Sequence, residues 1–120
     1  MPEAGQYAMN GPGSPNPDAT LRRMRVQASA EQIRITVHAQ QEMAEESISI
    51  VEVLEAIATA RILEDYPEHQ RGACCLIGGR TTTERPLHIV CTTTRQLLII
   101  ITVYEPKPPK WVTPTQRRRS

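Results

Sequence analysis

The sequence predicts an α+β fold in which two N-terminal helices pack on a small antiparallel sheet. Three apolar runs, 73–78, 87–91 and 97–104, are rich in Ile, Val, Leu and Cys and have the length of strands. Two helical patterns precede these runs, and helices followed by strands are typical of α+β domains. The connection 92–96 has hairpin length, which predicts that the last two strands are antiparallel neighbours.

A chain of 120 residues is long enough for one domain with its own core. Residues 1–20 are rich in proline and glycine and poor in aliphatic side chains, which predicts a disordered leader. The α+β domain is expected over residues 21–112. Residues 113–120 are expected to form a basic, disordered tail.

The 14 Lys and Arg residues nearly balance the 13 Asp and Glu residues, so no global field draws the protein to nucleic acid. The C-terminal segment is locally basic, which would attract phosphate or an acidic partner, although its composition alone favours a solvated terminus. No signal peptide and no apolar run of about 18 residues is present, so we expect no membrane partner. The three cysteines lie in strand-like runs without a Cys-x-x-Cys motif, which indicates a reducing, cytoplasmic setting.

A short helix and an extended segment are predicted in the first part of the chain. Leu21, Met24 and Ala28 have helical spacing and predict a short amphipathic helix. Residues 32–36 alternate, which predicts either a short edge strand or an extended lead into the next helix. Thr36 can cap that helix at its N-terminus.

The next helix has a stronger start, because Ser49 and Glu52 form a capping box. Residues 45–48 alone separate the two helices, which predicts an antiparallel helix pair. Ile62 then begins an extended segment that ends at Tyr66.

The run 97–104 is predicted as the central strand, covered on both faces, because it is almost wholly apolar. In the run 87–91, Leu87 and Ile89 share one face and His88 lies on the other. The segment 78–80 lacks the Gly-Lys-Ser/Thr pattern of a phosphate loop and is interpreted as a turn.

Metal-free RNA cleavage requires a base for the 2′-hydroxyl, an acid for the leaving oxygen and a cation for the phosphorane. His38, near a helix N-terminus, is expected to be neutral and therefore suited to act as a base or metal ligand. The groups that would act together are His38, His88, Tyr104 and one arginine among Arg80, Arg85 and Arg95. In the alternative, structural interpretation, the two histidines hydrogen-bond each other or a backbone carbonyl where the helices meet the sheet. No histidine or cysteine spacing is typical of a metal site, and no metal or other cofactor is expected.

Several segments together form a recognisable pattern: a His38-Ala39 helix start, 62–67 (Ile-Leu-Glu-Asp-Tyr-Pro), 85–90 (Arg-Pro-Leu-His-Ile-Val) and 100–106 (Ile-Ile-Thr-Val-Tyr-Glu-Pro). In order and spacing these closely resemble the bacterial domain-of-unknown-function family 4258. The resemblance covers about residues 30–112.

That family is grouped with the RelE/ParE-like toxins of toxin–antitoxin systems, so the resemblance implies a RelE-like fold. It also implies a toxin acting on RNA or translation, with an antitoxin-like protein and RNA or the ribosome as partners. As a metal-independent endoribonuclease, the domain would use His38 as base, His88 or Tyr104 as acid, and Arg85 to stabilise charge. The alternative is a non-catalytic protein-interaction module of the same fold, which binds through an open sheet edge or the tail.

The chain departs from the family pattern in two respects. Relatives often carry Arg where this chain has Glu42 and Glu46, so an RNA-binding surface there would repel phosphate. Relatives also often carry Gly at the position of Ser47, which predicts a left-handed residue or a reshaped turn in this chain.

Overall fold

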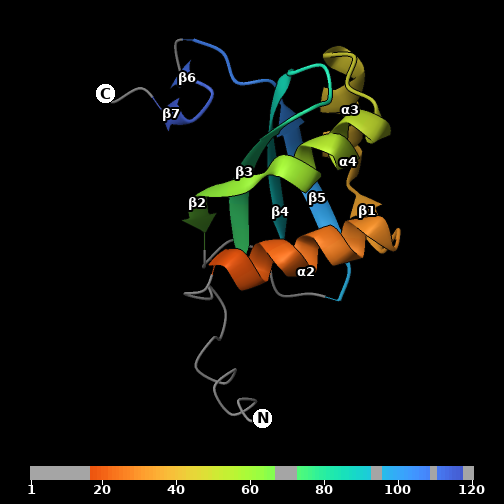
Figure 1. Ribbon diagram of the computed structural model, residues 1–120. Helices are drawn as coiled ribbons and strands as arrows, with labels where there is room; N and C mark the ends of the chain where they lie inside the picture. The colour runs from red at the N-terminus through yellow and green to blue at the C-terminus, as the bar shows by residue number, and fades with distance from the viewer. Residues whose placement is uncertain (1–16, 67–72, 93–95, 109–110, 118–120) are drawn as a thin grey trace.

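The computed structural model describes residues 17–66, 73–92, 96–108 and 111–117 (Figure 1). In chain order the elements are α2 (Pro17–Ser29), β1 (Ile33–Ile35), α3 (Val37–Glu45), α4 (Ile50–Thr59), β2 (Arg61–Tyr66), β3 (Cys74–Arg80), β4 (Pro86–Thr92), β5 (Leu98–Tyr104), β6 (Trp111–Thr113) and β7 (Gln116–Arg117). The fold is α+β, as predicted. In the described residues it has three helices, a five-stranded sheet and a separate two-stranded hairpin.

The five-stranded sheet has the order β1-β5-β4-β3-β2. Strands β2 to β5 are antiparallel neighbours, but β1 pairs in parallel with β5, with Ile33 opposite Leu98. The prediction that two N-terminal helices are followed by a purely antiparallel sheet was therefore wrong. The edge strand β1 is the first strand in the chain. Helices α3 and α4 then connect it to β2, at the opposite edge of the sheet.

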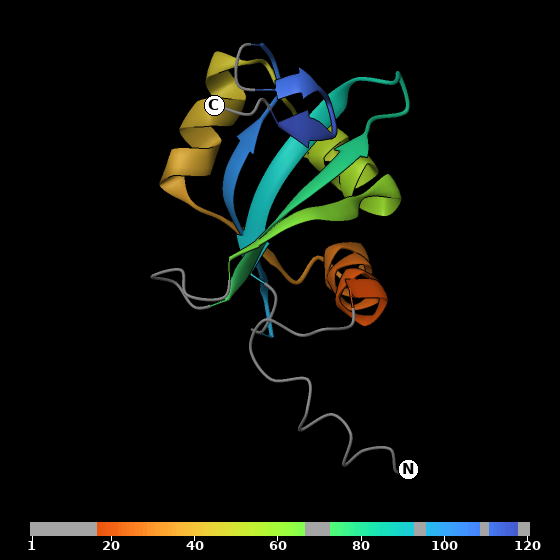
Figure 2. The same ribbon diagram turned by 90° about the vertical axis from the view of Figure 1, so that its left-hand side faces the viewer.

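Each helix packs against a different part of the molecule: α4 against β3, α3 against β5, and α2 against α4. In Figure 2, α2 and α4 stand on the same side of the strands. The predicted antiparallel pair is therefore not the main contact of α3 and α4. The predicted caps are confirmed, because Thr36 accepts the Ala39 N–H at 3.1 Å and Ser49 and Glu52 form a reciprocal capping box.

The core lies between the helices and one face of the sheet. Leu87 and Ile89 point into it and are fully buried, whereas His88 points to the opposite face, as the alternation predicted. The core contains Leu21, Met24, Ala28, Ala39, Met43, Ile48, Val53, Ala56, Ile57, Ala60, Cys75, Ile77, Leu87, Ile89, Cys91, Leu98, Ile100 and Val103.

Strand β5 differs from its prediction as a central strand covered on both faces. Strand β4 is the middle strand, and β5 lies between β4 and the short β1. Leu98, Ile100 and Val103 are buried against the helices, but the residues between them are only half-buried. The apolar run therefore fits an internal strand with one well-covered face.

The boundaries of the domain also differ from the expected ones. Helix α2 begins at Pro17, ahead of residue 21, and Thr20 is already buried. At the other end, β6 and β7 form a hairpin in the segment where the tail was expected to begin. The rest of the predicted leader and tail, residues 1–16 and 118–120, lies outside the described residues.

The three cysteines are buried as thiols, in agreement with their interpretation as small apolar residues. Cys75 lies opposite Cys91 on neighbouring strands. A hydrogen bond with Cys75, together with burial, raises the pKa of the Cys91 thiol well above its usual value. Cys75 and Cys91 contribute to the core by packing.

Gly79 lies inside β3 rather than in the predicted turn, and it controls how closely α4 approaches the sheet. A Cβ atom at this position would lie 1.9 Å from the carbonyl oxygen of Ala56 in α4. Only glycine allows this backbone contact between helix and strand.

Glu42 of α3 and Glu46, the residue that caps the C-terminus of α3, accept backbone hydrogen bonds at the outer edge of β5. The Val103 N–H donates to the Glu42 carboxylate at 2.9 Å, and the Glu105 N–H donates to the Glu46 carboxylate at 2.9 Å. Beyond Ile35, β1 no longer pairs with β5, so these two side chains take the place of a neighbouring strand. The acidic character of α3 therefore has a structural cause.

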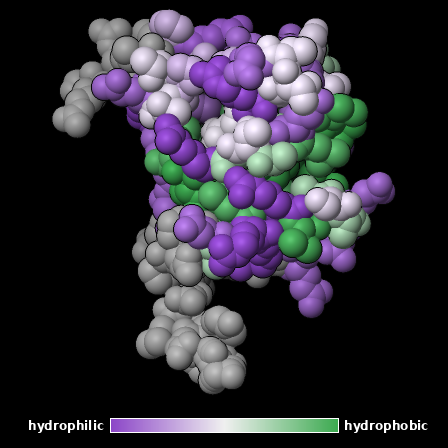
Figure 3. Space-filling view, viewed as in Figure 1, coloured by the Kyte–Doolittle hydropathy of each residue, from purple (hydrophilic) through white to green (hydrophobic). Residues whose placement is uncertain are grey.

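The helical side of the molecule carries scattered apolar side chains. Among the residues that the structure describes, the exposed large apolar side chains are Val26, Val37, Ile50 and Val51. Figure 3 shows apolar residues separated by hydrophilic ones on the face viewed. Single exposed aliphatic residues are normal on soluble domains and do not indicate a docking surface. None of the described helices is both long and apolar enough to span a bilayer.

Candidate functional site

Two of the predicted catalytic residues meet on the sheet face opposite the helical core. His88 of β4 lies directly across from Tyr104 of β5 in the strand register. The His88 Nδ1 atom is 3.2 Å from the Tyr104 hydroxyl, and the two rings make an edge-to-face contact with centroids 5.3 Å apart. His88 is 1% exposed, whereas Tyr104 is half-buried.

The other ring nitrogen of His88 is hydrogen-bonded to the carbonyl oxygen of Pro114, in the turn between β6 and β7. A carbonyl oxygen can only accept, so His88 Nε2 carries the hydrogen. In the neutral imidazole Nδ1 is then the acceptor, and the Tyr104 O–H donates to it. The hairpin thus sets the direction of the hydrogen bond between Tyr104 and His88.

A second polar group adjoins this pair. The Arg117 guanidinium of β7 makes two hydrogen bonds to the Glu64 carboxylate of β2, with N–O distances of 2.6 and 2.8 Å. This contact raises the pKa of Arg117, and the nearby Tyr66 and Tyr104 hydroxyls act in the same direction. The Tyr66 hydroxyl donates to the same carboxylate. A cation and two phenols therefore lie close together on this face.

Tyr66 is expected to resist ionisation, because burial and then its hydrogen bond to Glu64 raise its pKa to about 12. The unfolded chain ionises this phenol near pH 10. The contribution of Tyr66 to the free energy of unfolding is therefore complete below pH 10 and is lost as the pH rises from about 10 to 12. Spectrophotometric titration should show one tyrosine that ionises at higher pH than the others, and this step should be absent from Tyr66→Phe. An unchanged titration curve in that variant would contradict the assignment.

A cleft of about 500 Å³ borders the His88 side of the pair, and Tyr104 is not among the residues that line it. Arg61 and Arg80 contribute exposed guanidinium groups to its lining, and Glu84 contributes a carboxylate. His88 and Pro114 form part of the wall, together with Thr59, Gly78, Gly79, Thr81, Pro86 and Thr115. Guanidinium and hydroxyl donors around a concave surface suit a phosphate-bearing ligand.

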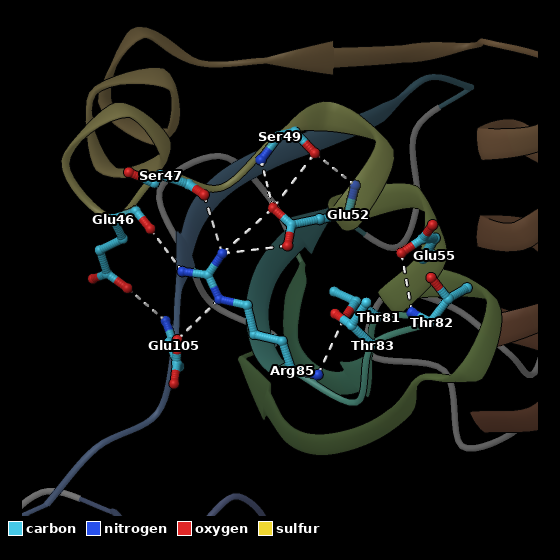
Figure 4. Close-up of polar contacts among 10 residues, drawn as sticks. All are labelled: Glu46, Ser47, Ser49, Glu52, Glu55, Thr81, Thr82, Thr83, Arg85 and Glu105. Carbon is cyan, nitrogen blue, oxygen red and sulfur yellow. Dashed lines mark hydrogen bonds and ion pairs between the residues drawn. The ribbon is translucent and has the colours of Figure 1, made fainter.

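Arg85, in contrast, is bound within the fold (Figure 4). Its guanidinium donates to the Glu105 carboxylate at 2.9 Å and to the carbonyl oxygens of Glu46 and Ser47 at 2.6 and 3.1 Å. It also lies 3.3 Å from the Glu52 carboxylate. Arg85 therefore joins the C-terminus of α3, the N-terminus of α4 and the end of β5.

The charges around Arg85 support one another. The Glu105 hydrogen bond, followed by that of Glu52, raises the pKa of Arg85. The Ser49 backbone N–H, followed by Arg85, lowers the pKa of Glu52. Ser47 takes a positive φ of 55°, which confirms the predicted left-handed residue and turns its carbonyl to Arg85.

Arg85→Ala should lower the free energy of unfolding by about 2–3 kcal/mol, because hydrogen bonds to partly buried charged groups are lost together. Urea denaturation measures this. Arg80→Ala is the matched control: the Arg80 guanidinium is exposed and bonds the Glu84 carbonyl, so a change within about 0.5 kcal/mol is expected. Equal losses in both variants would contradict the structural role of Arg85.

His38 lies apart from the His88–Tyr104 pair. Its side chain is 64% exposed on α3, and its Nε2 atom is 3.3 Å from the Glu42 carboxylate. His88 instead bonds a backbone carbonyl, which is one of the structural roles considered for it, but on the face away from the helices. Of the predicted set, the structure brings together His88 and Tyr104, with Arg80 in the adjoining cleft. Arg95 lies outside the described residues.

Glu64, Pro114 and Arg117 also belong to this site, but they were not predicted from the sequence. Glu64 and Tyr66 are two positions apart in an extended segment, so their shared face was a usable signal. No local pattern connects Arg117 with Glu64, which precedes it by 53 residues. Within the described part of the chain, no cluster of three or more His, Cys, Asp or Glu residues is placed to hold a metal ion.

Comparison with known proteins gives one match. The family model described as "Domain of unknown function (DUF4258)" matches residues 35–105, which is more than half of the chain. No curated protein and no solved structure matches the chain. The matched segment contains β2 to β5 with His88, Tyr104, Glu64 and Tyr66, whereas α2 and the β6–β7 hairpin lie outside it.

Proposed function

The chain belongs to the family of domains of unknown function DUF4258, and on this premise we propose that it is a RelE/ParE-like toxin that cleaves RNA without a metal ion. The observation that carries the proposal is the His88–Tyr104 pair beside the cleft with Arg61 and Arg80. RNA cleavage fits this pair because the reaction needs proton transfer and charge stabilisation and no cofactor.

The proposed proton path follows the hydrogen bonds of the site. The Tyr104 oxygen takes the proton of the RNA 2′-hydroxyl while its own proton passes to His88 Nδ1, which becomes imidazolium. The 2′-oxygen attacks the phosphorus, the bond to the 5′-oxygen breaks, and the leaving oxygen takes a proton from solvent. In this proposal Tyr104 meets the substrate, because its side chain is half-buried whereas that of His88 is almost fully buried.

The developing negative charge on the phosphorane requires a cation, and the cleft offers arginines from two strands. Arg61 of β2 and Arg80 of β3 line the cleft, whereas Arg117 is engaged with Glu64. Fixed guanidinium groups stabilise phosphoryl charge when they are positioned before the reaction. In this proposal they replace Arg85, whose donors are engaged within the fold.

The acidic residues of α3 are compatible with this site. Glu42 and Glu46 accept the N–H groups of Val103 and Glu105 at the outer edge of β5. They belong to the edge of the sheet and not to the face that carries Tyr104. The departure from the arginines of relatives therefore removes a basic helix without placing carboxylates in the proposed site.

The experiment that tests the function is induced expression in a bacterial host, followed by measurement of growth and bulk translation. The wild-type chain should arrest both, and the purified protein should cut RNA in the presence of a metal chelator, with cleavage sites located by end mapping. His38→Ala should arrest growth like the wild type, because His38 lies apart on α3. A soluble wild-type protein that neither arrests growth nor cuts RNA would overturn the proposal.

A second candidate is a non-catalytic interaction module of the same fold, favoured by the open edge of β2. This strand ends the sheet, and none of the described strands pairs with its outer side. Such an edge can accept a strand from a partner protein. A stable complex with an antitoxin-like protein, formed by a chain that cuts no RNA, would favour this candidate.

A further inference from the structure

The β6–β7 hairpin is an addition to the part of the chain that the family model matches. The match ends at residue 105, directly after β5, and the hairpin follows at 111–117. Yet the hairpin contacts two residues inside the matched segment, His88 and Glu64. A segment outside the matched part therefore completes the polar site of this chain.

The hairpin needs these contacts to hold its place. Its strands have three and two residues, and an isolated two-stranded hairpin of this size is at best marginally stable in water. Its contacts with the sheet include the forked Arg117–Glu64 ion pair and the hydrogen bond of the Pro114 carbonyl with His88. A bidentate guanidinium–carboxylate pair fixes orientation as well as distance.

We propose that the β6–β7 hairpin is a positioning strap, in which the Arg117–Glu64 pair holds the Pro114 carbonyl on His88 and thereby keeps Nδ1 as the acceptor for Tyr104. Pro114 acts only through His88 and is a positioning residue. The role of the strap in catalysis rests on the proposed function, whereas its effect on the tautomer of His88 does not.

The chemical consequence follows from the two tautomers of imidazole. With the strap in place, Nε2 carries the hydrogen and Tyr104 donates to Nδ1. Without it, the Nδ1–H tautomer also becomes accessible, and in that tautomer the ring donates to the Tyr104 oxygen instead of accepting its proton. Proton flow from Tyr104 to His88 is then blocked in that fraction of molecules.

The test uses full-length Arg117→Gln, with Lys107→Gln as the matched control, because both remove one positive charge from the same segment. Lys107 is exposed in the connection before the hairpin, whereas Arg117 holds Glu64. Glu64→Gln opens the same pair from the other side and provides a second variant if Arg117→Gln is unstable. Arg117→Lys keeps the charge but loses the fork, so it should restore the docking in part.

Two readouts report the strap directly. Nitrogen-15 spectra of the histidines should show a slowly exchanging Nε2–H for His88 in the wild type and in Lys107→Gln, and its loss in Arg117→Gln and Glu64→Gln. Deuterium uptake of the 111–117 segment should rise in the same two variants. RNA cleavage should fall by about 10- to 100-fold, the range typical of groups that orient an active partner.

An unchanged His88 signal with unchanged deuterium uptake in Arg117→Gln and Glu64→Gln would overturn the inference, whatever the activity. Loss of the Nε2–H signal with cleavage equal to the wild type would overturn the positioning role. A changed His88 signal in proteins that never cut RNA, the wild type included, would support the strap and overturn the proposed function.

Discussion

Replacing Tyr104 with Phe should lower the rate of RNA cleavage by about 10²- to 10⁴-fold, the range typical of losing one general acid–base group. The substitution removes the hydroxyl that lies 3.2 Å from His88 Nδ1 and keeps the ring that packs edge-to-face on the imidazole. Single-turnover cleavage of a defined RNA, followed with a metal chelator present, measures the effect on the chemical step.

The matched control is Tyr7→Phe, which removes a phenolic hydroxyl from a residue outside the family-matched segment. Its cleavage rate should equal that of the wild type. Thermal unfolding of Tyr104→Phe should stay close to the wild-type midpoint, because one partly exposed hydrogen bond contributes about 1 kcal/mol. A Tyr104→Phe enzyme with full activity would remove Tyr104 from the reaction.

Gly79→Ala should lower the free energy of unfolding by about 3 kcal/mol or more, at the upper end of the overpacking range. The added Cβ would lie 1.9 Å from the Ala56 carbonyl oxygen and 2.8 Å from its carbonyl carbon. Backbone atoms in the middle of a helix cannot rotate away, so α4 must move off β3 or β3 must distort. Urea denaturation followed by circular dichroism measures the loss.

Gly78→Ala is the control for this prediction, since it adds the same methyl group one position earlier on the opposite face of β3. Its nearest neighbour is the terminal Cδ1 of Leu63 at 2.8 Å, which can change rotamer, followed by the His88 ring at 3.4 Å. A loss of about 1 kcal/mol is expected. Equal losses at both positions would contradict the assigned helix–strand contact.

The local elements of the fold were predictable because their signals lie within a few residues of one another. The capping box of α4 spans Ser49 to Glu52, and the strands β3, β4 and β5 each coincide with a predominantly apolar run. The same local view predicted a short edge strand at 32–36 as one alternative, which β1 confirms, but it did not predict the parallel partner, which lies on β5 at Leu98. Nothing within the segment 32–36 specifies a parallel partner so far along the chain.

The candidate site was predictable only in part. The resemblance and the alternation along β4 pointed to His88 and Tyr104, and the structure pairs them. Arg85 had the right chemistry for a catalytic cation, but its donors hold the ends of α3 and α4 and the end of β5. A residue type shows what a side chain can do, and its neighbours decide what it does.

The sequence by itself determined the helix caps, the apolar strands and the α+β class, because each depends on hydrogen bonds or side-chain periodicity between near neighbours. Only the tertiary structure decided the strand order, the engagement of Glu42 and Glu46 at the β5 edge, and the placement of Arg117 on Glu64. These contacts join groups more than fifty residues apart. Such pairings are selected by the packing of the whole chain, which satisfies buried polar groups wherever the fold brings them.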